Sequence, residues 1–91
     1  MKFQGKVAMI TGASVGIGRA VALGLSEQGA DLVLLDINTE KLLQVEEEVK
    51  KHGHKVLAYD CDVSDEEKVN EVTADAAKRL GKIDILVNNA A

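Results

Sequence analysis

Three closely spaced glycines follow an apolar run near the start of the chain. The run is residues 7–10, and the glycines are Gly12, Gly16 and Gly18. Glycines at this spacing let a phosphate approach backbone N–H groups, because a Cβ would clash with the ligand or forbid the turn. A helix that begins near Ile17 directs its unpaired N–H groups and the positive end of its dipole at the same charge. The segment therefore predicts a strand, a phosphate-binding turn and the start of a helix.

A carboxylate stands where a dinucleotide-binding strand–helix–strand unit needs one. The second apolar run, residues 32–35, ends in Asp36. An acidic side chain at this point accepts hydrogen bonds from the hydroxyls of an adenosine ribose and repels a 2′-phosphate. The alternative is that Asp36 only begins a turn before Asn38.

The residues nearest the ribose in this interpretation carry no basic side chain. They are Ser14, Val15 and Ile37. A 2′-phosphate on the ribose needs Arg or Lys beside it to offset its charge. The sequence therefore predicts NAD as the cofactor and makes NADP the less favoured one.

Four apolar runs alternate with segments of helical periodicity. The runs are residues 7–10, 32–35, 56–59 and 83–87, and they are aliphatic, as buried parallel strands are. Strands joined by helices run parallel, and such crossovers are right-handed. Residues 1–91 are therefore expected to form one α/β dinucleotide-binding segment. It would be half of a doubly wound Rossmann fold, with four strands in the order 3-2-1-4, three crossover helices, and helices on both faces of the sheet.

The helical segments carry end signals and apolar stripes. Each ends at a glycine, Gly29, Gly53 or Gly81, because glycine readily adopts the left-handed conformation that closes a helix. The third segment also begins with a capping box formed by Ser64 and Glu67. The predicted core stripes are Ile17, Ala20, Val21, Gly24 and Leu25 on the first helix, Leu42, Val45 and Val49 on the second, and Val69, Val72, Ala76 and Leu80 on the third.

The predicted strand order makes one edge of the sheet a candidate ligand site. Open α/β sheets bind ligands where the carboxyl ends of the first and fourth strands flank the reversal in strand order. The glycine turn lies on one side of this point, and Asn88 and Asn89 lie on the other. The third strand supplies Asp62 and Val63. Asp62 either accepts a hydrogen bond from an adenine amino group, with Val63 against the ring, or only forms a turn, and the spacing leaves both interpretations open.

Composition and charge argue against several partners. The chain has 91 residues, a net charge of −4 and a single cysteine, Cys61. A negative chain has no electrostatic reason to bind nucleic acid or an anionic membrane, and no run reaches the roughly 20 apolar residues of a membrane span. Without a secretory signal, we expect a cytoplasmic protein. No metal site is expected around His52 and His54, and Cys61 is expected to be buried at a strand end.

Together the motifs resemble the short-chain dehydrogenase/reductase family. The resemblance is carried by Thr-Gly-x-x-x-Gly-x-Gly at residues 11–18, Asp36, Asp62-Val63 and Asn88-Asn89-Ala90, at the family's usual intervals. It implies an oxidoreductase that moves hydride between a nicotinamide dinucleotide and a small carbonyl or alcohol substrate. It also implies that Asn89 lies near the cofactor ribose and that Asn88 joins the central strands. Ala91 stands where the family usually has Gly.

No catalytic residue can be assigned in these 91 residues. The family that the chain resembles uses a Tyr, a Lys four residues later and a Ser, but the single Tyr59 is followed at that interval by Val63. The serines have other predicted places: Ser14 in the glycine turn, Ser26 on the surface of the first helix and Ser64 at the helix cap. In the family, the catalytic residues lie beyond the Asn-Asn-Ala motif. We therefore interpret the chain as the N-terminal, cofactor-binding part of such an enzyme, inactive alone and homo-oligomeric.

Two other functions stay open at this stage. A methyltransferase also has a glycine turn after its first strand and an acid after its second, but its turn runs Gly-x-Gly-x-Gly. The wider gap between Gly12 and Gly16 argues against it. The other alternative is a non-catalytic nucleotide-binding or interaction module built on a truncated half-fold.

Overall fold

Four parallel strands alternate with three helices in residues 1–89, the part of the chain that the computed structural model describes. The elements are β1 (Val7–Thr11), α1 (Gly16–Glu27), β2 (Asp31–Asp36), α2 (Thr39–Lys50), β3 (Val56–Asp60), α3 (Glu66–Leu80) and β4 (Ile85–Asn88). The strands lie in the order β3-β2-β1-β4, and each neighbouring pair is parallel. The predicted fold class and strand order are confirmed.

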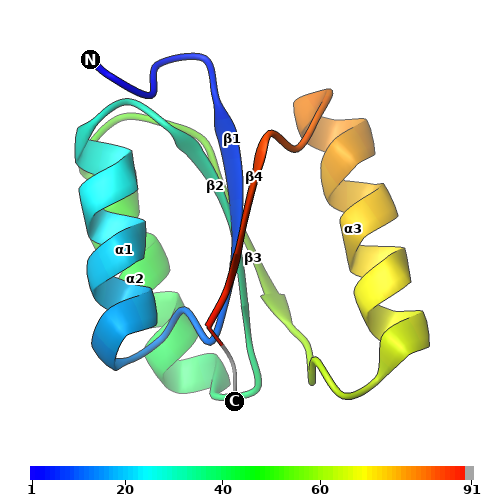
Figure 1. The fold of residues 1–91 in the computed structure, drawn as a ribbon. Coiled ribbons are helices and arrows are strands. Elements are labelled where there is room, and N and C mark those ends of the chain that lie inside the picture. The colour runs from blue at the N-terminus through cyan, green and yellow to red at the C-terminus, as the bar shows by residue number, and fades with distance from the viewer. Residues whose placement is uncertain (90–91) are drawn as a thin grey trace.

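The helices cover the two faces of the sheet unequally. Figure 1 shows α1 and α2 side by side on one face, with α3 alone on the other. This arrangement follows from right-handed crossovers. α1 and α2 connect β1 to β2 and β2 to β3, so they move across the sheet in one direction. α3 connects β3 to β4, which lies at the other edge, so it crosses in the opposite direction and covers the opposite face. The carboxyl ends of the strands consequently meet at one edge, the lower one in Figure 1.

Two separate cores form because strand side chains alternate between the faces. The core under α1 and α2 contains Ala8, Ile10, Leu32, Leu34, Leu42, Val45 and Val49, among others. The core under α3 contains Val7, Met9, Val33, Leu35, Cys61, Val72 and Ala76. Since β1 and β2 are buried on both sides, their sequences are continuous apolar runs rather than alternating ones.

The predicted stripes are confirmed for two helices and only in part for the first, where Val21 and Leu25 pack against the core. Val45 and Val49 of α2 and Val72 and Ala76 of α3 are buried. On α1, however, the buried residues are Gly18, Ala22 and Ser26. Ile17 is 73% exposed, and Ala20 and Gly24 are also exposed, whereas Val21 and Leu25 are half-buried. The close approach of α1 to the end of β1 requires the smallest side chains on its inner face, which turns the bulky Ile17 outward.

Ser26 is buried, so its predicted place on the helix surface is wrong. Its side chain is 0% exposed, and its Oγ lies 2.9 Å from Nδ1 of His52, which follows α2. The position is eight residues after Gly18, on the same face of α1. A hydroxyl is tolerated there because the His52 ring provides its hydrogen-bond partner.

The predicted cap of the third helix is wrong by one residue. α3 begins after Asp65, whose carboxylate accepts a hydrogen bond from the backbone N–H of Lys68. The Ser64 hydroxyl instead donates to Asp62 Oδ1 over 2.8 Å. Aspartate caps a helix at least as well as serine, so Asp65 displaces the predicted pair of Ser64 and Glu67.

Two further local predictions, for Gly81 and Cys61, are confirmed. Gly81 ends α3 with a φ of +87°, a left-handed conformation that favours glycine. Cys61 follows β3 directly and is 2% exposed, and burial raises the pKa of its thiol.

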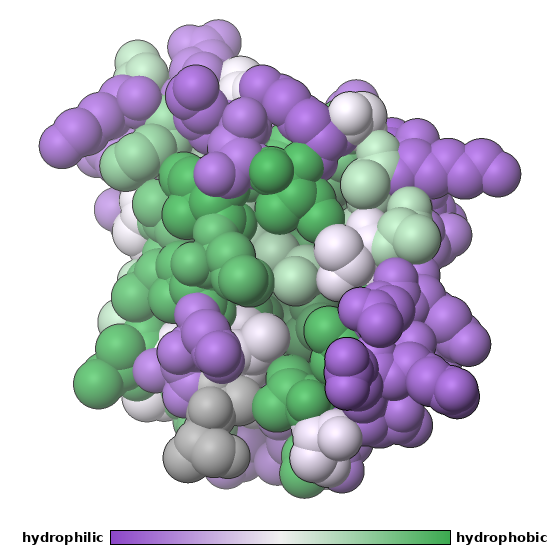
Figure 2. Space-filling view, turned by 45° about the vertical axis from the view of Figure 1, so that its right-hand side comes forward, coloured by the Kyte–Doolittle hydropathy of each residue, from purple (hydrophilic) through white to green (hydrophobic). Residues whose placement is uncertain are grey.

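The β4 side of the sheet exposes apolar surface. β4 is an edge strand of the sheet formed by residues 1–89, and its Leu86 is 62% exposed on the face that α3 only partly covers. Figure 2 shows hydrophobic side chains running down the middle of this side of the molecule, bordered by hydrophilic ones. Within residues 1–89, no helix has the length and apolar character needed to cross a membrane. The same residues contain no group of three or more His, Cys, Asp or Glu side chains that could hold a metal ion.

Candidate functional site

The glycine loop connects β1 to α1 at the carboxyl edge of the sheet. Gly12 and Gly16 have φ values of +63° and +56°, so both adopt the left-handed conformation that other residues rarely reach. The helix begins directly at Gly16, which brings its first N–H groups to the same point. The side chains of Val15 and Ile17 project into solvent, at 49% and 73% exposure.

Gly18 packs against the loop too closely for any side chain. A Cβ at this position would lie 2.0 Å from the carbonyl oxygen of Gly12 and 2.8 Å from Nδ2 of Asn89. Asn89 in turn donates from Nδ2 to the same Gly12 oxygen over 3.3 Å. The loop is therefore closed by the first turn of α1 on one side and by the residue after β4 on the other.

Asp36 ends β2 and contacts the glycine loop directly. Its Oδ2 accepts hydrogen bonds from the Ser14 backbone N–H, at 3.1 Å, and from the Ser14 hydroxyl, at 2.6 Å. Its Oδ1 accepts from the backbone N–H of Asn38 at 3.0 Å. Asp36 therefore does form a turn with Asn38, as the alternative interpretation expected. The same carboxylate also lies beside the glycine loop.

The surroundings of Asp36 favour its charged form. Partial burial alone would raise the pKa of this carboxyl, but hydrogen bonds from Asn38 and from both donors of Ser14 outweigh it and hold the pKa below its usual value. The group is therefore an anion at neutral pH, as an acceptor for ribose hydroxyls must be. The site has no basic residue at positions 14, 15 or 37, and Ile37 is 66% exposed.

Thr11 joins the ends of β1 and β4. Its hydroxyl donates to Oδ1 of Asn88 over 3.2 Å and accepts from the backbone N–H of Asn89 at 3.0 Å. Asn88 is the last residue of β4 and pairs with Thr11 in the β1–β4 register, so its hydrogen bond with Thr11 joins the two strands. Thr11 itself was not among the predicted site residues, although it is the first residue of the glycine motif.

Asp62 and Val63 follow β3, farther along the same edge. Asp62 Oδ1 accepts from the backbone N–H and the hydroxyl of Ser64, at 2.9 and 2.8 Å. These bonds hold the pKa of Asp62 below its usual value. Asp62 therefore does form the turn that one of the two interpretations expected.

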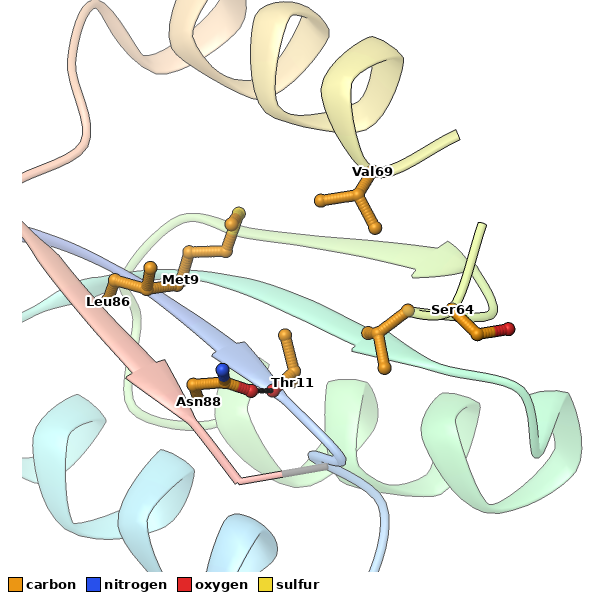
Figure 3. Close-up of a pocket in the computed structure, with 7 residues that line it drawn as sticks. Met9, Thr11, Ser64, Val69, Leu86 and Asn88 are labelled. Atoms are coloured by element: carbon orange, nitrogen blue, oxygen red, sulfur yellow. Dashed lines mark hydrogen bonds between the residues drawn. The ribbon is translucent and has the colours of Figure 1, made fainter. Parts of the chain in front are cut away.

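A pocket of about 360 Å³ opens beside these loops on the α3 face of the sheet. It is lined by Met9, Thr11, Val63, Ser64, Val69, Leu86 and Asn88. Figure 3 shows side chains from β1 and β4 on one wall, Val69 of α3 on the opposite wall, and the Thr11–Asn88 hydrogen bond at one end. The lining is mostly apolar with a few polar groups, as in binding sites for small molecules.

The structure thus brings most of the predicted residues to one edge. Ser14 contacts Asp36, and Gly12 contacts both Gly18 and Asn89. Asp62 and Val63 belong to a neighbouring loop that reaches the pocket instead. The predicted positions Ala90 and Ala91 lie outside the described residues.

Several known proteins are similar to this chain in sequence or in structure. The first is 46% identical over 87 residues, which is 96% of this chain and 33% of the relative: 2,3-dihydro-2,3-dihydroxybenzoate dehydrogenase of Bacillus subtilis (strain 168). The structure of NAD+-bound xylitol dehydrogenase matches all of this chain and 35% of that protein, with a TM-score of 0.97 and 44% identity. A metagenomic short-chain oxidoreductase in complex with NADP matches with a TM-score of 0.93 and 37% identity, over 100% of this chain and 41% of its own.

The matches cover this chain almost fully but only part of each relative. The chain spans about a third of the length of the curated relatives it matches. The sequence model of the short chain dehydrogenase family matches residues 6–91, which include the glycine loop, Asp36 and both asparagines. Since this match extends over nearly the whole sequence, the chain belongs to the short-chain dehydrogenase family.

Proposed function

We propose that residues 1–91 bind a nicotinamide dinucleotide, NAD in preference to NADP, as the cofactor-binding part of an oxidoreductase. The whole protein would transfer hydride between this cofactor and a small carbonyl or alcohol substrate. One observation carries the proposal. The ends of β1, β2 and β4 bring the glycine loop, Asp36 and Asn89 into hydrogen-bonded contact at a single edge of the sheet. Family membership and the NAD-bound relative support it.

Each predicted residue has a role in this proposal. The loop of Gly12, Gly16 and Gly18 would hold the pyrophosphate at the start of α1, with Ile17 at the exposed first turn. Asp36 would accept the adenosine ribose hydroxyls, beside Ser14 and Val15. Ile37, which is exposed next to Asp36, would contact the adenine side of the cofactor.

The neighbouring loops would contact the adenine and the second ribose of the cofactor. Val63 would pack against the adenine ring, and the free oxygen of Asp62 would accept from its amino group. Asn89 would lie near the ribose of the nicotinamide half. The match to the family leaves the methyltransferase alternative without support.

The preference for NAD rests on charge. Relatives with bound NAD and with bound NADP are both similar to this chain, so likeness alone does not choose between the cofactors. The ionised Asp36 and the absence of Lys or Arg at positions 14, 15 and 37 favour the cofactor without the 2′-phosphate.

Calorimetric titration with NADH and NADPH tests the proposal. NADH is expected to bind more tightly than NADPH, and weakly, since the chain spans about a third of the length of the relatives it matches. S-adenosylmethionine serves as the control ligand and is expected not to bind. Tighter binding of NADPH would contradict the assignment of Asp36. A chain that binds neither dinucleotide would favour the non-catalytic interaction module instead.

The 91-residue polypeptide is expected to have no dehydrogenase activity by itself. It contains no Tyr-x-x-x-Lys sequence, and Tyr59 donates its hydroxyl proton to Asp75 on α3, away from the glycine loop. General acid catalysis alone contributes about a hundred- to ten-thousand-fold in rate. We therefore propose that the catalytic residues belong to a portion of the protein outside residues 1–91. Reduction of a carbonyl panel above the cofactor-only background, by polypeptide of verified mass, would show this to be wrong.

The same polypeptide is expected to self-associate. β4 offers an apolar parallel-sheet edge, and Leu86 beside it is 62% exposed. Unpaired strand edges next to apolar surface promote association. Light scattering after size-exclusion chromatography measures the outcome, and Leu86→Lys is expected to weaken the association. A monodisperse monomer of about 10 kDa at high micromolar concentration would contradict the expectation.

A further inference from the structure

Ser14 is bound to Asp36 through two donors that share one acceptor. The backbone N–H and the hydroxyl lie 3.1 and 2.6 Å from Oδ2 of Asp36. The Ser14 side chain is nearly buried, because the residue is only 4% exposed. Hydrogen bonds from a hydroxyl to a carboxylate at this distance belong to the stronger, charge-assisted class. The glycine loop therefore fixes one oxygen of the acid that ends the neighbouring strand.

The second oxygen of Asp36 is fixed independently. Oδ1 accepts from the backbone N–H of Asn38, the N-cap residue of α2, over 3.0 Å. A carboxylate held at one oxygen only can rotate about its Cβ–Cγ bond, whose torsional preference is broad. With both oxygens held, the orientation of the carboxylate is set before any ligand arrives, which lowers the entropy lost on binding.

We propose that Ser14 is a positioning residue that sets the preference for NAD over NADP by holding the Asp36 carboxylate in place for the ribose hydroxyls. This inference rests on the proposed function. A held carboxylate accepts the hydroxyls without reorganisation and keeps its charge where a 2′-phosphate would lie. A carboxylate that loses the 2.6 Å bond from the Ser14 hydroxyl keeps only the longer 3.1 Å bond from the Ser14 backbone N–H at Oδ2. It is then held less firmly, which weakens NADH binding and reduces the repulsion of NADPH.

The chain contains a matched control for this arrangement. Ser64 donates from its backbone N–H and its hydroxyl to Oδ1 of Asp62, at 2.9 and 2.8 Å. The donor pattern is the same as in the Ser14–Asp36 pair, a backbone N–H and a hydroxyl on one carboxylate oxygen, but Ser64 is exposed and lies only two residues from its aspartate. In the proposed function, however, Asp62 faces the adenine, which NADH and NADPH share. Ser64→Ala is therefore expected to change the affinity for both cofactors by the same factor.

The experiment measures the ratio of the Kd values for NADPH and NADH by calorimetry in the 91-residue chain. Ser14→Ala is expected to lower this ratio by about tenfold, which is the low end of the effect expected for one lost hydrogen bond to a charged group. Ser14→Thr, which keeps a hydroxyl, should keep the ratio close to that of the unmodified chain. Ser64→Ala should leave it unchanged. The thermal melt of each variant verifies that it is folded.

A second readout separates positioning from a merely structural role. As pH falls through the pKa of Asp36, its carboxylate is neutralised and the preference for NADH disappears. Ser14→Ala removes a bond that lowers the pKa of Asp36, so the loss of preference should move to higher pH. Neighbouring titratable groups are Asp60, opposite Asp36 in the β2–β3 register, and Glu40 in the first turn of α2, while residues 12–18 carry none. Carbon-detected NMR assigns the Asp36 titration separately.

The outcomes distinguish this inference from the proposed function. An unchanged ratio in Ser14→Ala, or an equal loss of affinity for both cofactors, overturns the role of Ser14 while leaving dinucleotide binding intact. An unshifted Asp36 titration in a folded Ser14→Ala variant overturns it as well. If the unmodified chain binds neither cofactor, the proposed function fails and this inference fails with it.

Discussion

Gly18→Ala is expected to abolish dinucleotide binding and to destabilise the fold. The new Cβ would meet the Gly12 carbonyl oxygen at 2.0 Å, and that atom is backbone, so it cannot move without displacing the loop. Displacement would also break the hydrogen bond from Asn89 to Gly12. Overpacking of this kind costs about 3 kcal/mol, which lowers the melting temperature of a small domain by about 10 °C or more. Thermal unfolding and NADH titration measure both effects.

Gly24→Ala is the matched control for this substitution. Gly24 lies on the same helix, and a Cβ there meets no atom within 4 Å. Alanine is favoured over glycine by about 1 kcal/mol inside a helix, so this variant should be slightly more stable and should bind NADH normally. Equal behaviour of the two variants would show that the close contact at Gly18 is not what the loop depends on.

The double variant Asp36→Ala, Ile37→Arg is expected to reverse the cofactor preference. It removes the anion that repels a 2′-phosphate and places a guanidinium at a position that is 66% exposed and free to turn toward it. The new charge-assisted contact and the lost repulsion contribute about 1.5 kcal/mol each. Together they change the ratio of the NADPH and NADH affinities by about 100-fold. Calorimetric titration of both cofactors measures the ratio.

A second double variant separates this local effect from overall charge. Glu47→Ala, Leu43→Arg produces the same change in net charge, from two exposed positions of α2. The preference should stay with NADH in this variant. A reversal there as well would mean that total charge, rather than the Asp36 site, governs the choice.

The fold was predictable because its signals are regular. The continuous apolar runs of β1 and β2 reflect burial on both faces, and the connecting helices leave only parallel pairing with right-handed crossovers. The periodicity of α2 is also unambiguous, since Leu42, Val45 and Val49 are large side chains among charged ones. Such patterns depend on the local sequence alone.

The errors occurred where tertiary contacts override local patterns. On α1, apolar character predicted Ile17 in the core, but the Gly18 contact with Gly12 sets the rotation of the helix. Ser26 looked like a surface residue because its partner, His52, is distant in sequence. At α3, two adjacent capping residues competed, and Asp65 prevailed over Ser64.

The candidate site was predictable in its members but not in its contacts. Spacing placed Asp36 near the loop, yet it could not show that Ser14 holds the carboxylate. Nor did it show that the Thr11 hydroxyl joins the asparagines after β4 to the end of β1. Hydrogen bonds between residues far apart in sequence leave no periodic signal, so they appear only once the strands are placed.

The contact between Asn89 and Gly12 determines when the glycine loop can be completed during protein synthesis. The two residues are 77 positions apart, and β4 docks against β1 rather than against its predecessor in the chain. A nascent chain can pair β1 with β2 early, through contacts close in sequence, but the loop stays open until residue 89 has been made and β4 has inserted. The ligand edge is therefore the last part of residues 1–89 to mature, and dinucleotide capture would report that β4 has docked against β1.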